Sequence, residues 1–263
     1  MPDRSRLYRI DAIVMHRSDM GEADRLLTVL SRDQGKLRVN AKGARKVASR
    51  KGGHVELFTR SKMLIAKSRG NIDIVSQVEM TEAYRGLHED LTRSTYAHYA
   101  VELIDAFAEE GTAQPDIFDL LADALSWIAN SNNLPLTTRY FELKLLTLAG
   151  FQPQVFVCAV KGEPLEEIKV DENYGWSPNA GGAICPTHSE GRSDAGRLSL
   201  NALKVLRHAL RSNYQTFTAL TVSESVQNEI EQAMLRYVQY VLERHVKSIE
   251  FLNLLKRESA NEP

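Results

Sequence analysis

Hydrophobic and polar residues alternate along the first eighty positions of the chain, and this two-residue period predicts β-strands. Five strands are expected, over residues 8–15, 24–31, 36–42, 62–67 and 72–78. A polar turn over residues 18–22 separates the first two, and a turn ending at Gly35 connects the second to the third. Five short strands with a long loop after the third predict a small barrel of the OB type, with an SH3-like barrel as the alternative.

Beyond about Met80 the hydrophobic period lengthens to about 3.6 residues, which predicts helices. They are expected over residues 96–107, 116–128, 137–148, 200–210, 224–247 and 248–257. Gly150 and Pro153 mark the end of the third helix. The predicted fold class is therefore α+β. We expect an OB-fold domain over residues 1–80, an α-helical domain over residues 81–153 and 199–257, a cysteine-containing insert over residues 154–198, and a tail over residues 258–263.

The most distinctive stretch runs from Lys36 to Lys51. Its first half alternates, with Leu37, Val39 and Ala41 on one face of a strand and Lys36, Arg38, Asn40 and Lys42 on the other. Its second half carries Arg45, Lys46, Arg50 and Lys51 between glycines 43, 52 and 53, which predicts a mobile loop. A cationic strand face that leads into a basic loop fits a polyanion with regularly spaced phosphates better than a small ligand.

Charge is distributed unevenly, although the formal net charge is only -1. Residues 1–80 contain 17 Lys and Arg against 9 Asp and Glu, and the remainder contains 16 against 25. Residues 36–69 contain 11 basic side chains and a single acid, Glu56. A basic module joined to an acidic body is typical of a nucleic-acid-binding protein with a second task. The alternative, lysines that only solvate a sheet face, is less favoured because such faces normally mix both signs.

Composition narrows the class of protein further. A hydrophobic content of 43% and a charged content of 25% are typical of a soluble globular protein. No apolar run approaches the roughly 18 residues of a membrane span, and the charged N-terminus has no apolar signal segment, so secretion is not expected. Two cysteines, Cys158 and Cys185, provide no disulfide framework, which predicts a reducing cytoplasm.

Short motifs recur in a fixed order along nearly the whole chain. They are Gly21–Thr28 (GEADRLLT), Gly35-Lys36, Ala41–Lys46 (AKGARK), Tyr140–Leu146 (YFELKLL), Gly150–Pro153 (GFQP) and Gly181–Cys185 (GGAIC). Each motif is weak alone, but together they resemble the RecO family of bacterial DNA repair and recombination mediators. The resemblance implies an OB domain, a helical C-terminal domain and an insert that often binds zinc.

The resemblance also implies a function. A protein of this kind is not an enzyme; it binds single- and double-stranded DNA and anneals complementary strands. Its expected partners are RecR and single-strand binding protein, and with RecR it would help to load RecA on coated single strands. The expected location is the cytoplasm, in association with the nucleoid.

Eleven cations are the candidate DNA-binding residues: Lys36, Arg38, Lys42, Arg45, Lys46, Arg50, Lys51, Arg60, Lys62, Lys67 and Arg69. Residues 1–80 contain only two aromatics, Tyr8 and Phe58, and Phe58 is expected in the core. Base stacking should therefore contribute little, and phosphate contacts should dominate binding. Neutralising roughly five phosphates would give a log-log salt slope of about -3.5 on single strands.

The insert departs from the two Cys-x-x-Cys pairs that the resemblance implies for zinc-binding members. The first pair here is Cys158 with Lys161, and the second is Cys185 with His188. Cys158, Cys185 and His188 are three candidate ligands where structural zinc sites normally use four, and a protonated lysine cannot replace a thiolate. The sequence therefore favours no cofactor, with zinc as the alternative. A metal-free insert would be held by packing of Phe156, Ile168, Tyr174 and Trp176.

Arg139 is the candidate contact for a protein partner, because it lies beside Phe141 on a predicted helix. The resemblance implies that the helical domain receives the acidic C-terminal tail of single-strand binding protein, which an arginine beside an apolar groove would suit. An ordinary surface arginine is the alternative.

Other chemistry is not indicated. No glycine-rich phosphate loop followed by Lys-Ser or Lys-Thr is present, so the sequence gives no case for an ATPase. The acidic pairs Glu109-Glu110 and Glu166-Glu167 are adjacent in sequence and are expected at the surface. Two rival functions stay open: an RNA-binding regulatory module of OB or SH3-like type without annealing activity, and a hydrolase assembled from such carboxylates.

Overall fold

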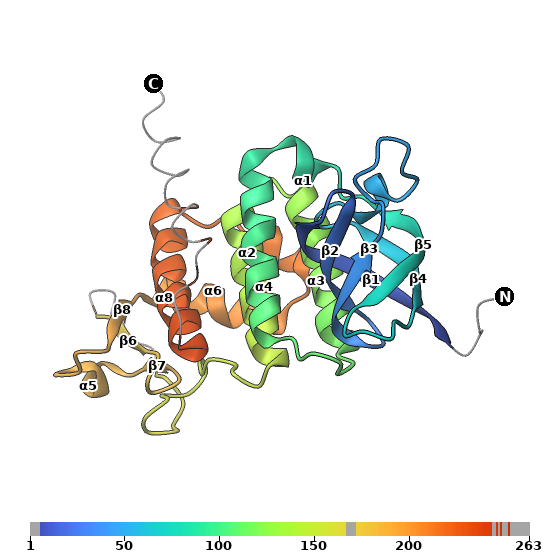
Figure 1. The fold of residues 1–263 in the computed structure, drawn as a ribbon. Helices are drawn as coiled ribbons and strands as arrows, with labels where there is room; N and C mark the ends of the chain where they lie inside the picture. Colours follow the sequence, from blue (N-terminus) through green and yellow to red (C-terminus); the bar gives the residue numbers. More distant parts are fainter. Residues whose placement is uncertain (1–5, 167–171, 244–245, 247, 249–251, 253–263) are drawn as a thin grey trace. The chain divides into compact units, whose positions relative to one another are not determined.

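The structure is a computed structural model that describes residues 6–166, 172–243, 246, 248 and 252 (Figure 1). These residues divide into two compact units, one containing the described residues up to Asn130 and the other those from Ser131 on. The division falls within the predicted helical region and not at residue 80, because the helices up to Asn130 belong to the same compact unit as the barrel. The domain boundaries expected from the sequence stay a prediction.

The first unit begins with five strands: β1 (Leu7–Met20), β2 (Asp24–Ser31), β3 (Gly35–Ala41), β4 (Arg60–Ala66) and β5 (Asp73–Glu82). They form a closed barrel in the order β1-β2-β3-β5-β4, and β4 pairs with β1 to close it. Only the pairing of β3 with β5 is parallel among these strands. A closed five-stranded barrel of this kind is the OB type, so the predicted α+β class is confirmed.

Alternate residues of the strands fill the barrel. The interior includes Ile10, Val14, Leu27, Val29, Val39, Ala41, Met63, Ile65 and Val75, each at most 3% exposed. The predicted inward face of β3 is therefore confirmed at Val39 and Ala41. The outer face differs from the prediction at Asn40, which is only 6% exposed, because its amide donates to the carboxylate of Asp24.

The hairpin between β1 and β2 is longer than the sequence indicated. The predicted turn over residues 18–22 is wrong at its start, because residues 18–20 continue β1 and pair with residues 24–26. Side chains of residues 16–20 are exposed, so no apolar alternation marks this part of the strand. Backbone hydrogen bonds to β2 are sufficient to hold it as a strand. The hairpin therefore carries its polar turn beyond the barrel wall.

Three helices complete the first unit: α1 (Gly86–Glu89), α2 (Leu91–Phe107) and α3 (Pro115–Asn130). Asp90 caps α2 by accepting from the backbone N–H of Arg93. The segment after α2 runs against the turn between β2 and β3, where Gly35 has a φ of 65°. A Cβ at Gly35 would lie 2.0 Å from the carbonyl oxygen of Thr112, so only glycine fits this approach.

The second unit is built on α4 (Leu134–Leu148), which packs against α6 (Leu200–Arg211), α7 (Tyr214–Thr218) and α8 (Glu224–Leu242). Asn133 caps α4 and Ser199 caps α6. The last of these helices ends at Leu242, earlier than the predicted residue 247, and Glu243 has a left-handed φ of 49°. Most of the predicted helix over residues 248–257 lies outside the described residues. None of the described helices is both long and apolar enough to cross a membrane.

The insert contains a three-stranded sheet in the order β7-β6-β8, formed by β6 (Tyr174–Ser177), β7 (Gly182–Ile184) and β8 (Gly196–Leu198), and the short helix α5 (Pro186–Ser189). Tyr174 and Trp176 are buried, as predicted. The indole N–H of Trp176 donates to the carbonyl of Ala233 at 2.8 Å, which fixes β6 on α8. Phe156 is half-buried, and Ile168 lies outside the described residues.

Candidate nucleic-acid interface

The GEADRLLT and AKGARK motifs are in contact at the β1–β2 hairpin. Asp24, at the start of β2, accepts the backbone N–H of Gly43 at 2.8 Å and the amide of Asn40 at 3.3 Å. The backbone N–H of Arg45 donates to the carbonyl of Ala23 at 2.9 Å. The hydrogen bond from Gly43 and other contacts hold the pKa of Asp24 below its ordinary value. The GEADRLLT motif therefore holds the start of the basic loop, residues 42–51, in place.

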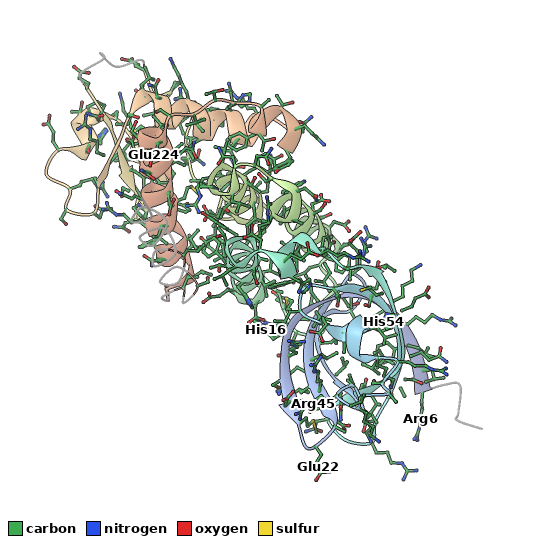
Figure 2. All side chains as sticks on the ribbon, turned by 90° about the horizontal axis from the view of Figure 1, so that it is seen from above. Arg6, His16, Glu22, Arg45, His54 and Glu224 are labelled. Carbon is green, nitrogen blue, oxygen red and sulfur yellow. The ribbon has the colours of Figure 1, made fainter. Side chains whose placement is uncertain are left out.

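Two of the loop's cations also help to anchor it. Figure 2 shows Arg45 near the hairpin turn that carries Glu22, and its guanidinium donates to the carbonyl of Gly21 at 3.2 Å. Arg45 also pairs with Asp19 at 3.3 Å. At the other end of the loop, Lys51 donates to the carbonyl of Val75 on β5 at 2.6 Å, and burial lowers its pKa. The loop is thus tied to the barrel at both ends.

Glu56 subtracts little from the positive surface, although it is the single acid between residues 36 and 69. Its carboxylate forms ion pairs with Arg17 and Arg25. Both arginines belong to the hairpin, so Glu56 balances hairpin charge and forms no ion pair with a cation of the loop.

The predicted DNA-binding cations fall into two groups. Eight are exposed: Arg38, Lys42, Arg45, Lys46, Arg50, Lys62, Lys67 and Arg69. Three are half-buried and occupied within the unit: Lys36, Lys51 and Arg60. Lys36 donates to the backbone and side chain of Asp105, at 2.9 and 3.1 Å. Arg60 binds the carboxylate of Asp11 and lies 5.1 Å from the ring centre of Phe118.

The structure brings the exposed cations together unevenly. Lys42, Lys46 and Arg50 share the basic loop with Arg45, and Arg38 precedes them on β3. Because Val39 pairs with Asp73, the β4–β5 turn that carries Arg69 lies beside β3. Lys62 is set apart from these residues, since it pairs in register with Asp11 on one side and Glu79 on the other.

Aromatic rings are scarce on the barrel surface. Phe58 is 1% exposed, so its predicted place in the core is confirmed. Tyr8 is half-buried, and its hydroxyl donates to Asp73 at 2.9 Å. The exposed large hydrophobic residues of the five strands and the basic loop are Met20, Val47 and Met80, none of them aromatic. The surface therefore offers phosphate contacts and few platforms for base stacking.

A second candidate site lies in the insert, where the three predicted ligands converge. Cys158, Cys185 and His188 form a group that could hold a metal ion. Burial by itself raises the pKa of the Cys158 thiol, but backbone N–H groups, including that of Cys185, donate to its sulfur and bring the pKa below its ordinary value. Lys161 is exposed and forms an ion pair with Glu163.

Arg139 does not lie in an exposed groove. Its side chain is 8% exposed and pairs with the fully buried carboxylate of Glu142 at 2.9 Å. The guanidinium also approaches the carbonyl of Glu231 at 3.4 Å. Arg139 is therefore engaged inside the second unit, where a peptide could reach it only by displacing these contacts.

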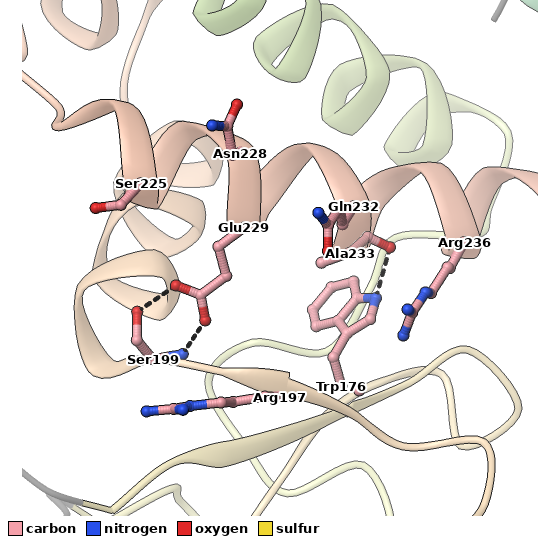
Figure 3. A pocket seen from close by; sticks show the side chains of 10 residues that line it. Trp176, Arg197, Ser199, Ser225, Asn228, Glu229, Gln232, Ala233 and Arg236 are labelled. Carbon is pink, nitrogen blue, oxygen red and sulfur yellow. Dashed lines mark hydrogen bonds between the residues drawn. The ribbon is translucent and has the colours of Figure 1, made fainter. Parts of the chain in front are cut away.

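A different pair of arginines borders a cleft of about 500 Å³ in the same unit (Figure 3). Arg197 on β8 and Arg236 on α8 are exposed, and neither forms an ion pair with another described residue. The nearby Glu229 is already bound by the N–H and hydroxyl of Ser199. Sequence reasoning missed these arginines, because a 39-residue separation and two different elements give no pattern that joins them.

Comparison with known proteins agrees with this architecture. Residues 5–84 match the family model described as "Recombination protein O N terminal", and residues 88–250 match "Recombination protein O C terminal". A barrel followed by helices with these matches defines a DNA repair protein of the recombination class. Curated relatives named "DNA repair protein RecO" include those of Roseiflexus sp. (strain RS-1), 38% identical over 95% of this chain and 86% of the relative, and Desulforamulus reducens, 35% identical over 97% of each. The chain belongs to the RecO family.

Proposed function

We propose that this protein binds single- and double-stranded DNA through phosphate contacts and anneals complementary strands, without enzymatic activity, in recombinational repair. The observation that carries the proposal is the surface of the barrel. It presents eight exposed cations and no exposed aromatic side chain among the large hydrophobic residues of its strands and basic loop. Such a surface attracts a phosphate backbone of any sequence.

Annealing is expected because the surface leaves the bases of the bound DNA free. Two strands pair only if their bases are accessible while the repulsion between their phosphates is reduced. A protein that stacks bases on aromatic rings would have to release them first, at about 1–3 kcal/mol per base. Cations that hold only the backbone neutralise the phosphates and keep the bases available. The anchored loop supports this role. Asp24 holds Gly43 at the start of the basic loop, and this fixes the position from which Lys46 and Arg50 extend.

The proposal extends to protein partners on the strength of the family membership. We expect the protein to act with RecR in loading RecA on strands coated by single-strand binding protein, in the bacterial cytoplasm. The acidic tail expected from single-strand binding protein needs an exposed cationic contact. Arg139 is buried, whereas Arg197 and Arg236 are exposed beside one cleft, so these two are the better candidates. Arg197→Ala with Arg236→Ala should weaken binding of an acidic tail peptide while DNA affinity stays unchanged; unchanged peptide affinity would remove the cleft from the site.

The experiment that tests the function is annealing of labelled complementary strands coated with single-strand binding protein. The proposal predicts faster pairing with the protein than without it, and a loss of this acceleration as salt rises. Binding without any acceleration would favour the rival RNA-binding regulatory module, which has no annealing activity. Incubation of the labelled strands with Mg²⁺ and Mn²⁺ is the control for the rival hydrolase, since cleavage abolished by one carboxylate substitution would contradict the non-enzymatic function.

A further inference from the structure

The basic loop contains one serine, Ser49, which lies between its cations. The sequence around it is Arg45-Lys46-Val47-Ala48-Ser49-Arg50-Lys51. The loop is closed at its neck, because a Cβ at Gly52 would lie 3.0 Å from the carbonyl oxygen of Ala44. The seven residues between these two points therefore present four cations, no acid and a single hydroxyl in one compact loop.

The hydroxyl of Ser49 has hydrogen-bond donors and positive charge around it. Ser49 is half-buried, and its neighbours Ala48 and Arg50 are exposed. The backbone N–H of Ser49 donates to the carbonyl of Lys46 at 2.8 Å, so a turn brings Lys46 back toward the serine. The oxygen Oγ accepts the backbone N–H of Lys51 at 3.2 Å. A phosphate attached to this oxygen would have that N–H and the flanking cations as donors of charge-assisted hydrogen bonds.

A protein kinase can reach this serine without unfolding the barrel. Residues 42–51 form neither a strand nor a helix, so only the turn and the hydrogen bond to Oγ have to open. Kinases select their substrates partly by charge pattern, and basic residues on both sides of Ser49 suit a kinase with an acidic peptide groove. Ser68 also lies between two cations, but its N–H donates to the carboxylate of Asp73 at 2.8 Å, and this acid would repel a phosphate.

We propose that Ser49 is a phosphorylation site for a serine/threonine kinase that selects basic peptides, and that the phosphate switches off DNA binding by the basic loop. In this reaction Oγ of Ser49 forms a bond to the γ-phosphorus of ATP, and the bond from that phosphorus to the β–γ bridging oxygen breaks. The hydroxyl proton passes to a base of the kinase, and ADP leaves. The inference rests on the proposed DNA-binding function and adds its regulation.

The size of the effect follows from the added charge. A phosphate carries about -1.5 to -2 charges at pH 7, which compensates about two cations of the loop. The closed neck and the turn at Lys46 keep these cations close to Ser49. Losing two phosphate contacts to DNA should flatten the log-log salt slope on single strands by about 1.4. Near physiological ionic strength, DNA binding should become roughly tenfold weaker.

The effect is tested with full-length protein that carries phosphoserine at position 49, incorporated during translation. Fluorescence anisotropy with a labelled single strand should show the weaker binding and the flatter slope, whereas Ser49→Ala should bind like the wild type. Phosphoserine at position 225 is the matched control, because Ser225 is exposed on α8 in the other unit. This control adds the same charge and should leave the slope unchanged. Equal effects of the two phosphates would overturn the inference, since net charge alone would then explain them.

A kinase assay tests whether Ser49 is a substrate. The probe is the catalytic subunit of cyclic-AMP-dependent protein kinase, which selects basic peptides, and casein kinase is the acid-directed control. Mass spectrometry should find phosphate on Ser49 after incubation with ATP and the first kinase, and none on Ser49 after incubation with the second. An unmodified Ser49 with the basic-directed kinase would overturn the inference.

The unmodified protein separates this inference from the proposed function. If it binds DNA while phosphoserine at position 49 changes neither affinity nor slope, the regulation is wrong and the DNA-binding function stands. If the unmodified protein, folded by circular dichroism, binds no DNA at any salt concentration, the proposed function fails and the inference fails with it.

Discussion

The basic loop provides the sharpest test of how this protein holds DNA. Lys46 and Arg50 are exposed, and neither forms an ion pair with another described residue, so their charges are available to phosphates. Arg45 and Lys51 also belong to the loop, but they anchor it through Gly21 and Val75. Replacing Lys46 and Arg50 with alanine should therefore remove phosphate contacts without releasing the loop.

The size of the effect follows from counterion release. If every one of the eight exposed cations neutralised one phosphate, the log-log salt slope on single strands would be about -5.6, which is the upper limit for this surface. Losing two contacts should flatten the slope by about 1.4 on single strands and by about 1.8 on duplex. Near physiological ionic strength, binding should become roughly tenfold weaker.

Fluorescence anisotropy of labelled oligonucleotides over a series of salt concentrations measures this slope. Lys204→Ala with Arg211→Ala is the matched control, because it removes two exposed charges from α6 in the other unit. The control should leave the slope unchanged. Equal flattening by both double variants would show that net charge, and not the loop, sets the salt dependence. An unchanged slope for the loop variant would refute the reasoning.

Three further predictions follow from individual contacts. Asp24→Ala should weaken DNA binding in anisotropy measurements, although it removes a negative charge, because the backbone of Gly43 loses its hydrogen-bond acceptor. Asp24→Asn keeps an acceptor and should not weaken binding. Tighter binding by the alanine variant would contradict the anchoring role of Asp24. His16, whose Nε2 lies 3.7 Å from the carboxylate, and Lys36, which donates to it, lower the pKa of Asp105 to about 2. The stability that Asp105 contributes is therefore present above its ordinary pKa of 3.8 and is lost as pH falls toward 2. Asp105→Asn should therefore make acid unfolding, followed by circular dichroism, less steep in that range, and an unchanged profile would exclude this contribution. Arg139→Ala should destabilise the protein by about 3–5 kcal/mol in urea unfolding, because it removes the cation that pairs with a fully buried carboxylate. A loss below about 1 kcal/mol would show that the pair is not needed.

Elements with a strong hydrophobic period were predictable from the sequence. The strand over residues 24–31 is found with the predicted bounds, and the helix predicted over residues 200–210 extends by one residue. The strands of the insert were not predicted, because β7 and β8 contain three residues each, too few to show a period. The exposed C-terminal end of β1 was not predicted for a related reason. A strand segment that pairs through its backbone without being buried shows no alternation of hydrophobic and polar residues in the sequence.

The sequence predicted which residues could form the candidate site, but not which of their side chains are exposed and which are engaged in ion pairs. The concentration of cations identified the basic loop, yet sequence could not show that Lys36 is tied to Asp105 or that Arg60 is bound by Asp11. Both acids are remote in sequence from their partners. Arg139 shows the same limit, because a charged residue on an amphipathic helix is ordinarily exposed and only packing placed it in the interior.

The central claim is that the barrel grips the DNA backbone and leaves the bases free, and an abasic strand tests it most directly. Affinity should be measured for two oligonucleotides of equal length and charge, one of them lacking bases throughout. The account predicts equal affinities and equal salt slopes. A single stacked base is worth about 1–3 kcal/mol, so clearly weaker binding of the abasic strand would contradict the claim.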